Sequence, residues 1–376
     1  MAPLTVITLS GVLLTKLGIF TKRTNDTISR ALARFLLPIY LFFNLVQTVN
    51  LNKLDVLWPN FVMPVIGVLL SFIPAVIEIL LLKHPKNLRY SFICLIGFSN
   101  AGLSLLIADG NCNSYGPLSK KKECSEIGGY VAIQLMVWSL IIFTFGYALM
   151  NADLMEAEKC KPKEDPKDMK EVEDNDEMEE NDPEKNSLEM AKTQSNLVQV
   201  KTSSFKRDMI RILTGPIPVF SLLGVLVGFI PGLNAVFYDS DAPLLPVAET
   251  GLVIGKAGIV IGQMILGSNL VLSARAKVSL SKPLIYSTIL VRNIIIPAIA
   301  LGTTYIFWVL KAFGDDVVMA FIFAINFAAP PSISVLVLSQ IFNNGIQEVT
   351  MLILWTYVTG VFTLTIFSYL FFTVFL

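Results

Sequence analysis

The sequence predicts an all-α polytopic membrane protein. Of its 376 residues, 54% are apolar and only 15% are charged, whereas a soluble domain carries about a quarter charged residues. Apolar runs of roughly 20 residues, the length that a helix needs to cross a bilayer, recur along the whole chain. Two of these runs, one in each half, are interrupted by small residues and prolines. Together these observations predict ten transmembrane helices in an inverted 5+5 repeat, with broken crossover helices four and nine.

The ten expected spans are separated by short polar loops, except at the centre of the chain. They cover residues 4–20, 27–49, 59–83, 88–108, 128–151, 207–231, 244–274, 283–310, 316–342 and 348–376. The first run lacks the charged segment and cleavage site of a signal peptide, so we expect it to remain as a helix. Because each half holds an odd number of spans, the second half is expected to insert upside down relative to the first.

The centre of the chain differs sharply in composition from both halves. Sixteen of the 29 acidic residues lie between Asp153 and Glu189, and so polar a segment cannot bury enough apolar surface to become ordered. The sequence therefore predicts a first five-helix repeat over 1–151, a disordered acidic cytosolic loop over 152–206 and a second, inverted repeat over 207–376. We interpret the loop as a solvated tether. The alternative is a docking surface for a partner or a set of phosphorylation sites at Ser187, Ser195, Ser203 and Ser204.

Basic residues set the expected orientation, because cytosolic loops carry an excess of Lys and Arg. The loops after spans one, three and seven are basic, and most of the opposite loops are acidic. The basic run 120–122 is the exception. This pattern predicts that both termini face the lumen or the exterior. The sequence has no basic domain of the kind that binds nucleic acid.

Cysteine and histidine usage limits the chemistry. Cys112 and Cys124 flank Gly116 and Pro117 in a loop on the expected lumenal side. Disulfides persist in that oxidising compartment, so we expect a bridge between these two cysteines. The single histidine, His84, is expected to be solvated in a cytosolic turn. The sequence has no His and Cys cluster with metal-ligand spacing, and we predict neither a metal nor a cofactor.

The two interruptions are the strongest candidates for a substrate site. The first runs from Gly97 to Ser104, and the second contains a double proline. Proline has no N–H donor and its ring clashes with the preceding turn, so the second run cannot continue as one helix. Half-helices that meet in the bilayer present positive dipole ends that suit a carboxylate, whereas unwound carbonyls suit a cation. A structural kink is the alternative interpretation. The candidate substrate-binding residues are Asn100, Gly102, Ser104, Asn326, Pro330, Pro331 and Ser332.

Charged residues inside the expected spans form a second group of candidates, because charge at membrane depth usually faces a cavity or a partner. Glu249 and Lys256 lie two helical turns apart on one face of span seven, and Arg292 lies well inside span eight. We interpret these three as coupling or counter-ion residues. The alternatives are a structural ion pair, a surface position for Glu249 and a buried structural role for Arg292. Glu78, near the end of span three, is expected to reach the cytosolic headgroups.

Several motifs make the chain similar to the PIN-LIKES family of carriers. In the first half these are the cysteine pair around Gly116-Pro117, the run Gly129-Tyr130-Val131 and an aromatic-rich fifth span. In the second half they are Asp241-Ala242-Pro243-Leu244, Leu266-Gly267-Ser268-Asn269-Leu270, Val291-Arg292, Pro330-Pro331, Ser339-Gln340-Ile341-Phe342 and Leu354-Trp355-Thr356-Tyr357. The resemblance covers essentially the whole chain apart from the acidic loop.

The resemblance implies the fold of auxin efflux carriers and bile-acid symporters. In that fold crossed broken helices form the substrate site, and a transport bundle moves against a scaffold. The resemblance also implies the endoplasmic reticulum and intracellular auxin, an indole carboxylate. The chain departs from the family pattern at both breaks: Ser104 stands where the family has proline, and Val335-Leu336-Val337 replaces a small polar stretch. These departures fall in the candidate site and therefore bear on the identity of the substrate.

We therefore expect a secondary carrier that moves a small organic anion across a lipid bilayer by alternating access. The endoplasmic reticulum membrane is the expected location, with the plasma membrane or another endomembrane as alternatives. A passive channel or a membrane sensor on the same fold is the competing interpretation, and a homodimer is left open. An enzyme is not expected, because a serine nucleophile needs a nearby base and His84 is the only histidine.

Overall fold

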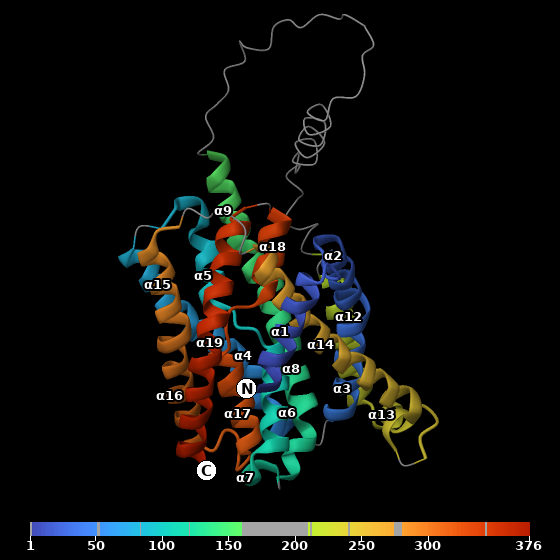
Figure 1. Cartoon of the computed structure of the whole chain (residues 1–376). Coiled ribbons are helices and arrows are strands. Elements are labelled where there is room, and N and C mark those ends of the chain that lie inside the picture. The colour runs from blue at the N-terminus through green and yellow to red at the C-terminus, as the bar shows by residue number, and fades with distance from the viewer. Residues whose placement is uncertain are drawn as a thin grey trace, which may run out of the picture.

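The chain is all-helical throughout the part that the structure describes (Figure 1). This computed structural model describes residues 2–50, 53–82, 84–119, 121–159, 210, 213–239, 241–273, 280–342 and 344–376. Residues 160–206 of the expected acidic loop, with its four candidate serines, lie outside the described residues.

The N-terminal half contains nine α-helices in the described residues. They are α1 Ala2–Lys16, α2 Lys22–Ala31, α3 Leu37–Thr48, α4 Leu54–Leu81, α5 Arg89–Gly97, α6 Gly102–Ser114, α7 Gly116–Ser119, α8 Ile127–Ile141 and α9 Tyr147–Lys159. The C-terminal half contains α12 Pro216–Phe229, α13 Pro231–Tyr238, α14 Leu245–Ser273, α15 Lys282–Leu290, α16 Ile296–Val309, α17 Val317–Ala328, α18 Ile333–Phe342 and α19 Ile346–Phe375.

Six continuous helical segments in the described residues are long and apolar enough to cross a membrane. They are Lys22–Thr48, Leu54–Leu81, Lys122–Glu156, Leu245–Leu272, Lys282–Val309 and Ile346–Phe375. A seventh results if α12 and α13, which are bent by 102° at their junction, are taken as one span. The remaining expected spans have a different form: α1 is a shorter apolar helix, the fourth span is divided into α5 and α6, and the ninth is divided into α17 and α18.

Two of the long segments accommodate a proline by widening the preceding turn. Pro38 and Pro297 each follow a π-helical turn, Leu32–Leu36 in one case and Val291–Ile295 in the other. A proline ring clashes with the carbonyl group four residues earlier, and the wider turn makes room for it. Arg292 lies in the second of these turns.

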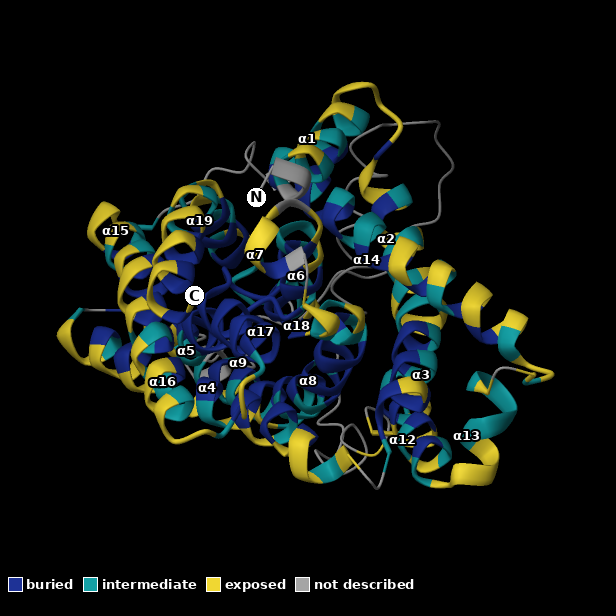
Figure 2. Ribbon diagram, turned by 90° about the horizontal axis from the view of Figure 1, so that it is seen from below, coloured by how far each residue is buried: buried dark blue, intermediate teal, exposed yellow. Residues whose placement is uncertain are grey.

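The helices pack into two groups, which Figure 2 shows from below. One group consists of α1, α2, α3, α12, α13 and α14, and the other contains α4 to α9 and α15 to α19. The groups touch where α3 and α12 pack on α8, where α1 packs on α6, and where α14 packs on α19. In the second group α17 is buried on every side, with all of its residues from Val317 to Ala328 inaccessible.

Close packing within the first group depends on a glycine. A Cβ atom at Gly255 of α14 would lie only 2.6 Å from the Cα atom of Tyr40 on α3. A larger residue would therefore force the two helices apart. Small residues are the usual means by which helices approach closely in membranes.

Two expectations about the end of the third span are wrong. His84 is only 5% exposed and is not solvated, and Glu78 is 4% exposed and does not extend toward the surface. Glu78 instead accepts hydrogen bonds from Ser287 and Thr288. Both donors are on α15, which is more than 200 residues away in the sequence, so local patterning could not reveal this contact.

Candidate functional site

The two broken helices meet at their breaks. The chain leaves α5 at Phe98 and enters α6 at Gly102, and it leaves α17 at Ala329 and enters α18 at Ile333. Between them an isolated antiparallel bridge pairs Ser99 with Pro331. The N–H of Asn100 donates to the carbonyl of Pro330 at 2.8 Å, and the N–H of Ser332 donates to the carbonyl of Phe98 at 2.9 Å. Each unwound segment thus satisfies the main chain of the other, which the apolar interior of a membrane protein requires.

A tyrosine on α19 joins the two breaks through side-chain contacts. The Nδ2 amide of Asn100 donates to the hydroxyl of Tyr357 at 2.6 Å, and this hydroxyl donates to the carbonyl of Pro331 at 3.0 Å. Beside it, Gly360 leaves room for the ring of Pro330, because a Cβ atom at Gly360 would lie 2.8 Å from Cγ of that proline. Helix α19 therefore supports the second break from behind.

Arg292 binds the ends of both half-helices that lead into the crossing. Its guanidinium is fully buried and donates to the carbonyls of Ile96 at 2.7 Å and Phe327 at 3.4 Å, and also to that of Ala329. These carbonyls belong to the C-terminal ends of α5 and α17, where the helix dipole is negative and a cation is stabilised. The structure therefore gives Arg292 a bonded, buried position behind the crossing.

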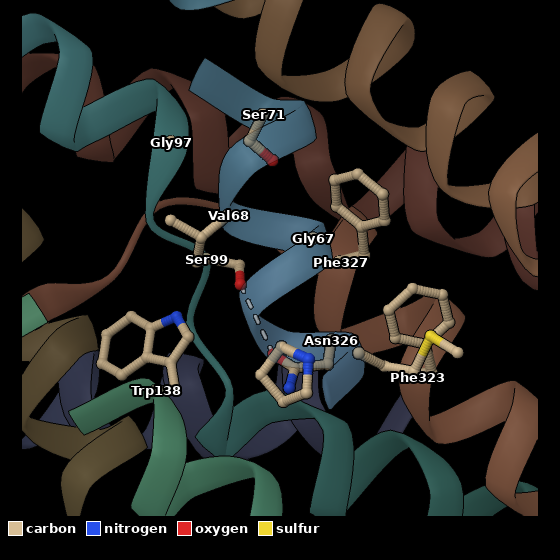
Figure 3. A pocket seen from close by; sticks show the side chains of 11 residues that line it. Gly67, Val68, Ser71, Gly97, Ser99, Trp138, Phe323, Asn326 and Phe327 are labelled. Carbon is tan, nitrogen blue, oxygen red and sulfur yellow. Dashed lines mark hydrogen bonds between the residues drawn. The ribbon is translucent and has the colours of Figure 1, made fainter. Parts of the chain in front are cut away.

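A chain of polar side chains extends from the crossing toward α4. Asn326 donates to Gln134 at 2.8 Å, and Gln134 donates to Asn60 at 3.0 Å. Ser99 lies 3.4 Å from Asn326, and Figure 3 shows its side chain directed at that amide. Ser99 and Asn326 line a cavity of about 10 Å³ together with Ser71 and Trp138. Only a single water or a small ion fits a space of this size.

A much larger cavity lies on the other side of the crossing. Its volume is about 500 Å³, and its wall is formed by α1, α6, α14 and α19 together with Pro330. Leu9, Leu103 and Leu270 contribute apolar surface from three of these helices, and Tyr357 contributes one polar side chain from the fourth. The cavity therefore lies between the two helix groups, and Pro330 of the second break faces it. A space of this size and character fits a small apolar ligand.

The positive ends of two half-helices converge on the same region. The first turn of α6 begins at Gly102, and Leu103 of that turn lines the large cavity. Helix α18 begins at Ile333, two residues after the bridged Pro331. The negative ends of α5 and α17 are bound by Arg292. Of the two positive ends, that of α6 reaches the large cavity through Leu103, and a positive helix end favours an anion.

The sequence-predicted residues divide into two sets. Asn100, Gly102, Asn326 and the double proline are brought together at the crossing, whereas Ser104 bonds within its own helix, to the carbonyl of Ala101 at 2.6 Å. The hydroxyl of Ser332 also bonds locally, accepting from the N–H of Ser334 at 3.1 Å, whereas its N–H donates to Phe98 across the crossing.

Four further predicted residues lie apart from the crossing. Glu249 and Lys256 lie on the exposed side of α14, away from its buried face. No ion pair joins them in the described part of the chain. Cys112 and Cys124 form a disulfide between the end of α6 and the turn before α8.

The sequence does not predict which side chains on other helices contact the two breaks. Tyr357, Gln134 and Asn60 lie far along the chain from the residues they contact. For Tyr357 the sequence does hold a signal, because this residue is the last of the family motif Leu354-Trp355-Thr356-Tyr357. The contribution of α1 to the cavity has no sequence signature.

Comparison with known proteins places the chain among membrane transport proteins. Residues 1–368 match the family model described as "Membrane transport protein". The chain is 25% identical to Protein PIN-LIKES 5 of Arabidopsis thaliana over 370 residues, which cover 94% of this chain and 90% of that protein. It is 24% identical to Protein PIN-LIKES 7 of the same plant, over 90% of this chain and 86% of that protein. The expected family resemblance is confirmed, and with it an integral membrane transporter rather than an enzyme. The chain belongs to the membrane transport protein family.

Proposed function

We propose that the chain is a secondary carrier that moves a small organic anion by alternating access at the crossed broken helices. One observation carries this proposal: two interrupted helices bond to each other through their main chains beside an apolar cavity of about 500 Å³. In transporters, interruptions at matching positions of two halves are the usual place of the substrate site.

The site that we propose combines an apolar chamber with an anion-binding end. The carboxylate would lie at the first turn of α6 and the second break, near Asn100, Gly102 and Pro330. The apolar body of the ligand would occupy the chamber lined by Leu9 and Leu270. This division suits an aromatic carboxylate, and resemblance to auxin efflux carriers favours an indole carboxylate. Asn326, Ser332 and Pro331 shape the crossing from behind.

The proposal includes the topology. Ten spans in an inverted repeat would place α5 and α6 opposite α17 and α18, which agrees with the antiparallel pairing of Ser99 and Pro331. Both termini would then face the lumen, and the acidic loop the cytosol. The endoplasmic reticulum membrane is the location that we propose. In this arrangement α1, α3, α12 and α14 form the static group, and the group with the crossing moves against it.

The test is uptake by purified protein in proteoliposomes. We expect saturable uptake of a radiolabelled indole carboxylate, accelerated by unlabelled substrate on the far side. Linear uptake without counterflow would indicate a channel instead. Binding without uptake would indicate a sensor.

Variants of the second break test the site itself. Pro330→Leu/Pro331→Leu restores N–H donors and helix propensity, so the break should close and uptake should be abolished. Pro283→Leu, at an exposed position in the first turn of α15, is the matched control and should transport normally. Uptake at the wild-type rate by a folded double variant would refute the site.

A further inference from the structure

A second buried polar cluster lies at the end of α4, apart from the crossing. Glu78 and His84 are both buried, and Oε1 of Glu78 lies 3.8 Å from Nε2 of His84. The same carboxyl oxygen lies 2.7 Å from the hydroxyl of Ser287 and 3.0 Å from that of Thr288. The other carboxyl oxygen and Nε2 of His84 have no hydrogen-bond partner. Most buried polar atoms in proteins have a hydrogen-bond partner, whereas these two atoms have none.

The tautomer of His84 follows from its neighbour. Nδ1 lies 3.1 Å from the carbonyl oxygen of Leu82, which can only accept, so Nδ1 carries the hydrogen. In a neutral imidazole Nε2 then presents a lone pair. That lone pair faces a carboxyl oxygen of Glu78. The contact becomes attractive when a proton resides on one of the two groups.

The surroundings of Glu78 can serve both its charged and its neutral form. The hydroxyl of Ser287 lies 2.7 Å from Oε1 of Glu78 and 3.0 Å from the carbonyl of Leu284, and its single hydrogen can be donated to only one of them. A carboxylate receives that hydrogen. A protonated carboxyl releases it to Leu284. In addition, the C-terminal end of α4 disfavours a negative charge and favours a protonated imidazole.

Within the described residues, no charged group other than these two forms an ion pair with Glu78 or His84. The ionisable side chains on the elements packed around the pair are Lys86, Arg89, Tyr90, Cys94, Tyr130, Lys282, Tyr286, Arg292 and Tyr305, and on α9, which packs on the turn Lys86–Leu88, they include Tyr147, Asp153 and Glu156. The carboxylate of Asp153 is bonded to the N–H groups of Tyr90 and Ser91. Glu78 lies within ion-pair distance of His84. The guanidinium of Arg292 is engaged with backbone carbonyls. A proton is therefore the cation that this site is built to hold.

We propose that Glu78 and His84 form a proton-binding site whose occupancy is coupled to transport. A short stretch of helix links this site to the crossing. Thr288 donates to Glu78 and precedes Arg292 by four residues, about one helical turn. Arg292 in turn binds carbonyls at the ends of both half-helices. A change in the bonds from α15 to Glu78 can therefore reach the crossing through one turn of helix. The coupling, unlike the proton site, rests on the proposed carrier function.

The proton site can be tested without any substrate. Because His84 is the only histidine, ¹⁵N-histidine labelling of the full-length protein in nanodiscs gives one imidazole signal by NMR. We expect the neutral form to be the Nδ1–H tautomer. Glu78→Gln should move the imidazole titration to lower pH, because the variant removes a negative neighbour. Glu249→Gln, at an exposed glutamate, is the control and should leave the midpoint unchanged.

The opposite results would overturn the proton site. An Nε2–H tautomer in the wild-type protein contradicts the geometry, and this measurement does not depend on whether any variant folds. A midpoint that is the same in wild type and Glu78→Gln shows that the two groups do not share a proton.

The coupling is tested by uptake of an indole carboxylate at a series of pH values. Wild-type uptake should change across the midpoint of the His84 titration, and the Glu78→Gln profile should be flat over that range. A variant that keeps the wild-type profile would refute the coupling. Absence of uptake by the wild type at every pH would instead refute the carrier function, and the NMR result would still decide the proton site.

Discussion

Arg292 connects the two breaks through a single buried side chain. Its guanidinium binds the carbonyls of Ile96 and Ala329, which belong to different halves of the chain. An arginine at membrane depth suggests a counter-ion for the substrate. Here, however, backbone carbonyl groups supply the negative partial charge that the guanidinium binds. The residue is therefore expected to matter first for stability and only through it for transport.

Replacing Arg292 with glutamine should lower the free energy of unfolding by about 3 kcal/mol or more, because charged hydrogen bonds are lost and buried carbonyls are left without donors. The stability of Arg292→Lys should lie between those of wild type and Arg292→Gln, because an ammonium group can still donate to the carbonyls at one of the two helix ends. Thermal unfolding of purified protein in detergent measures both. Arg89→Gln, at an exposed arginine on α5, is the control. Equal melting temperatures for Arg292→Gln and Arg89→Gln would contradict the role given to this guanidinium.

Tyr357→Phe tests the side-chain link between the breaks. It removes only the hydroxyl that accepts from Asn100 and donates to Pro331. We expect a loss of about 1–3 kcal/mol in the stability of the crossing because Asn100 is left without its buried partner. Uptake should therefore fall, because the second break loses its side-chain link to α19. Tyr286→Phe, whose side chain is 68% exposed, should transport as wild type. Similar rates for the two variants would show that this hydroxyl plays no part in transport.

At this scale the sequence located some residues at the two breaks and misplaced others. The double proline and Asn100 were located from local chemistry, since proline and small polar residues report directly on a broken helix. His84 and Glu78 were misplaced, because whether a residue at a helix end is covered depends on a distant helix. Glu249 and Lys256 share a face of α14, but spacing alone cannot say whether that face meets the crossing.

Among the elements, the break in the second half depends on its fit against α19. A Cβ atom at Gly360 would lie 2.8 Å from the ring of Pro330. Gly360→Leu should therefore displace the double proline and reduce uptake strongly. Gly302→Leu is a fitting control, because a Cβ atom there meets nothing within 4 Å. Uptake by both variants, measured per amount of folded protein, checks this. Normal uptake by Gly360→Leu would mean that the break tolerates displacement.

The disulfide fixes the connection between the broken fourth span and α8. It joins residues separated by 12 positions, and closing a loop of this length stabilises the folded state by about 3 kcal/mol in the chain-entropy account. Cys112→Ser/Cys124→Ser should therefore melt at a lower temperature than wild type. Reductant should lower the wild-type melting temperature by a similar amount and leave the double variant unchanged. A reductant effect on the double variant would point to another cause.

The sequence predicted the elements more completely than their partners. Apolar length located every long helix, and the prolines located the second break. The pairing of Ser99 with Pro331 and the position of α1 against the large cavity were not predictable, because both depend on how helices distant in sequence pack. The sequence does not predict the short helix α13, because its eight residues are too few to indicate a membrane span.

At the scale of the molecule, the large cavity lies between two helix groups, so alternating access predicts that these groups move relative to each other. Leu9 on α1 and Val361 on α19 both line the cavity. In a background lacking Cys94 and Cys160, Leu9→Cys/Val361→Cys joined by a bifunctional thiol reagent should stop uptake. The pair Phe42→Cys/Phe220→Cys lies within one group, where the two rings are 6.3 Å apart. Cross-linking that pair should leave uptake intact. Undiminished uptake after the first cross-link would exclude a movement of this kind.

The bonds that Arg292 forms with Ile96 have one further consequence. Neither half of the polypeptide contains all the groups that its own interruption needs. The carbonyl of Ile96 at the end of α5 accepts from Arg292 of the C-terminal half, and the N–H of Ser332 donates to Phe98 of the N-terminal half. If the gene were cut within the acidic segment, each fragment produced alone should be degraded. Co-production of the two should restore a functional heterodimer by complementation.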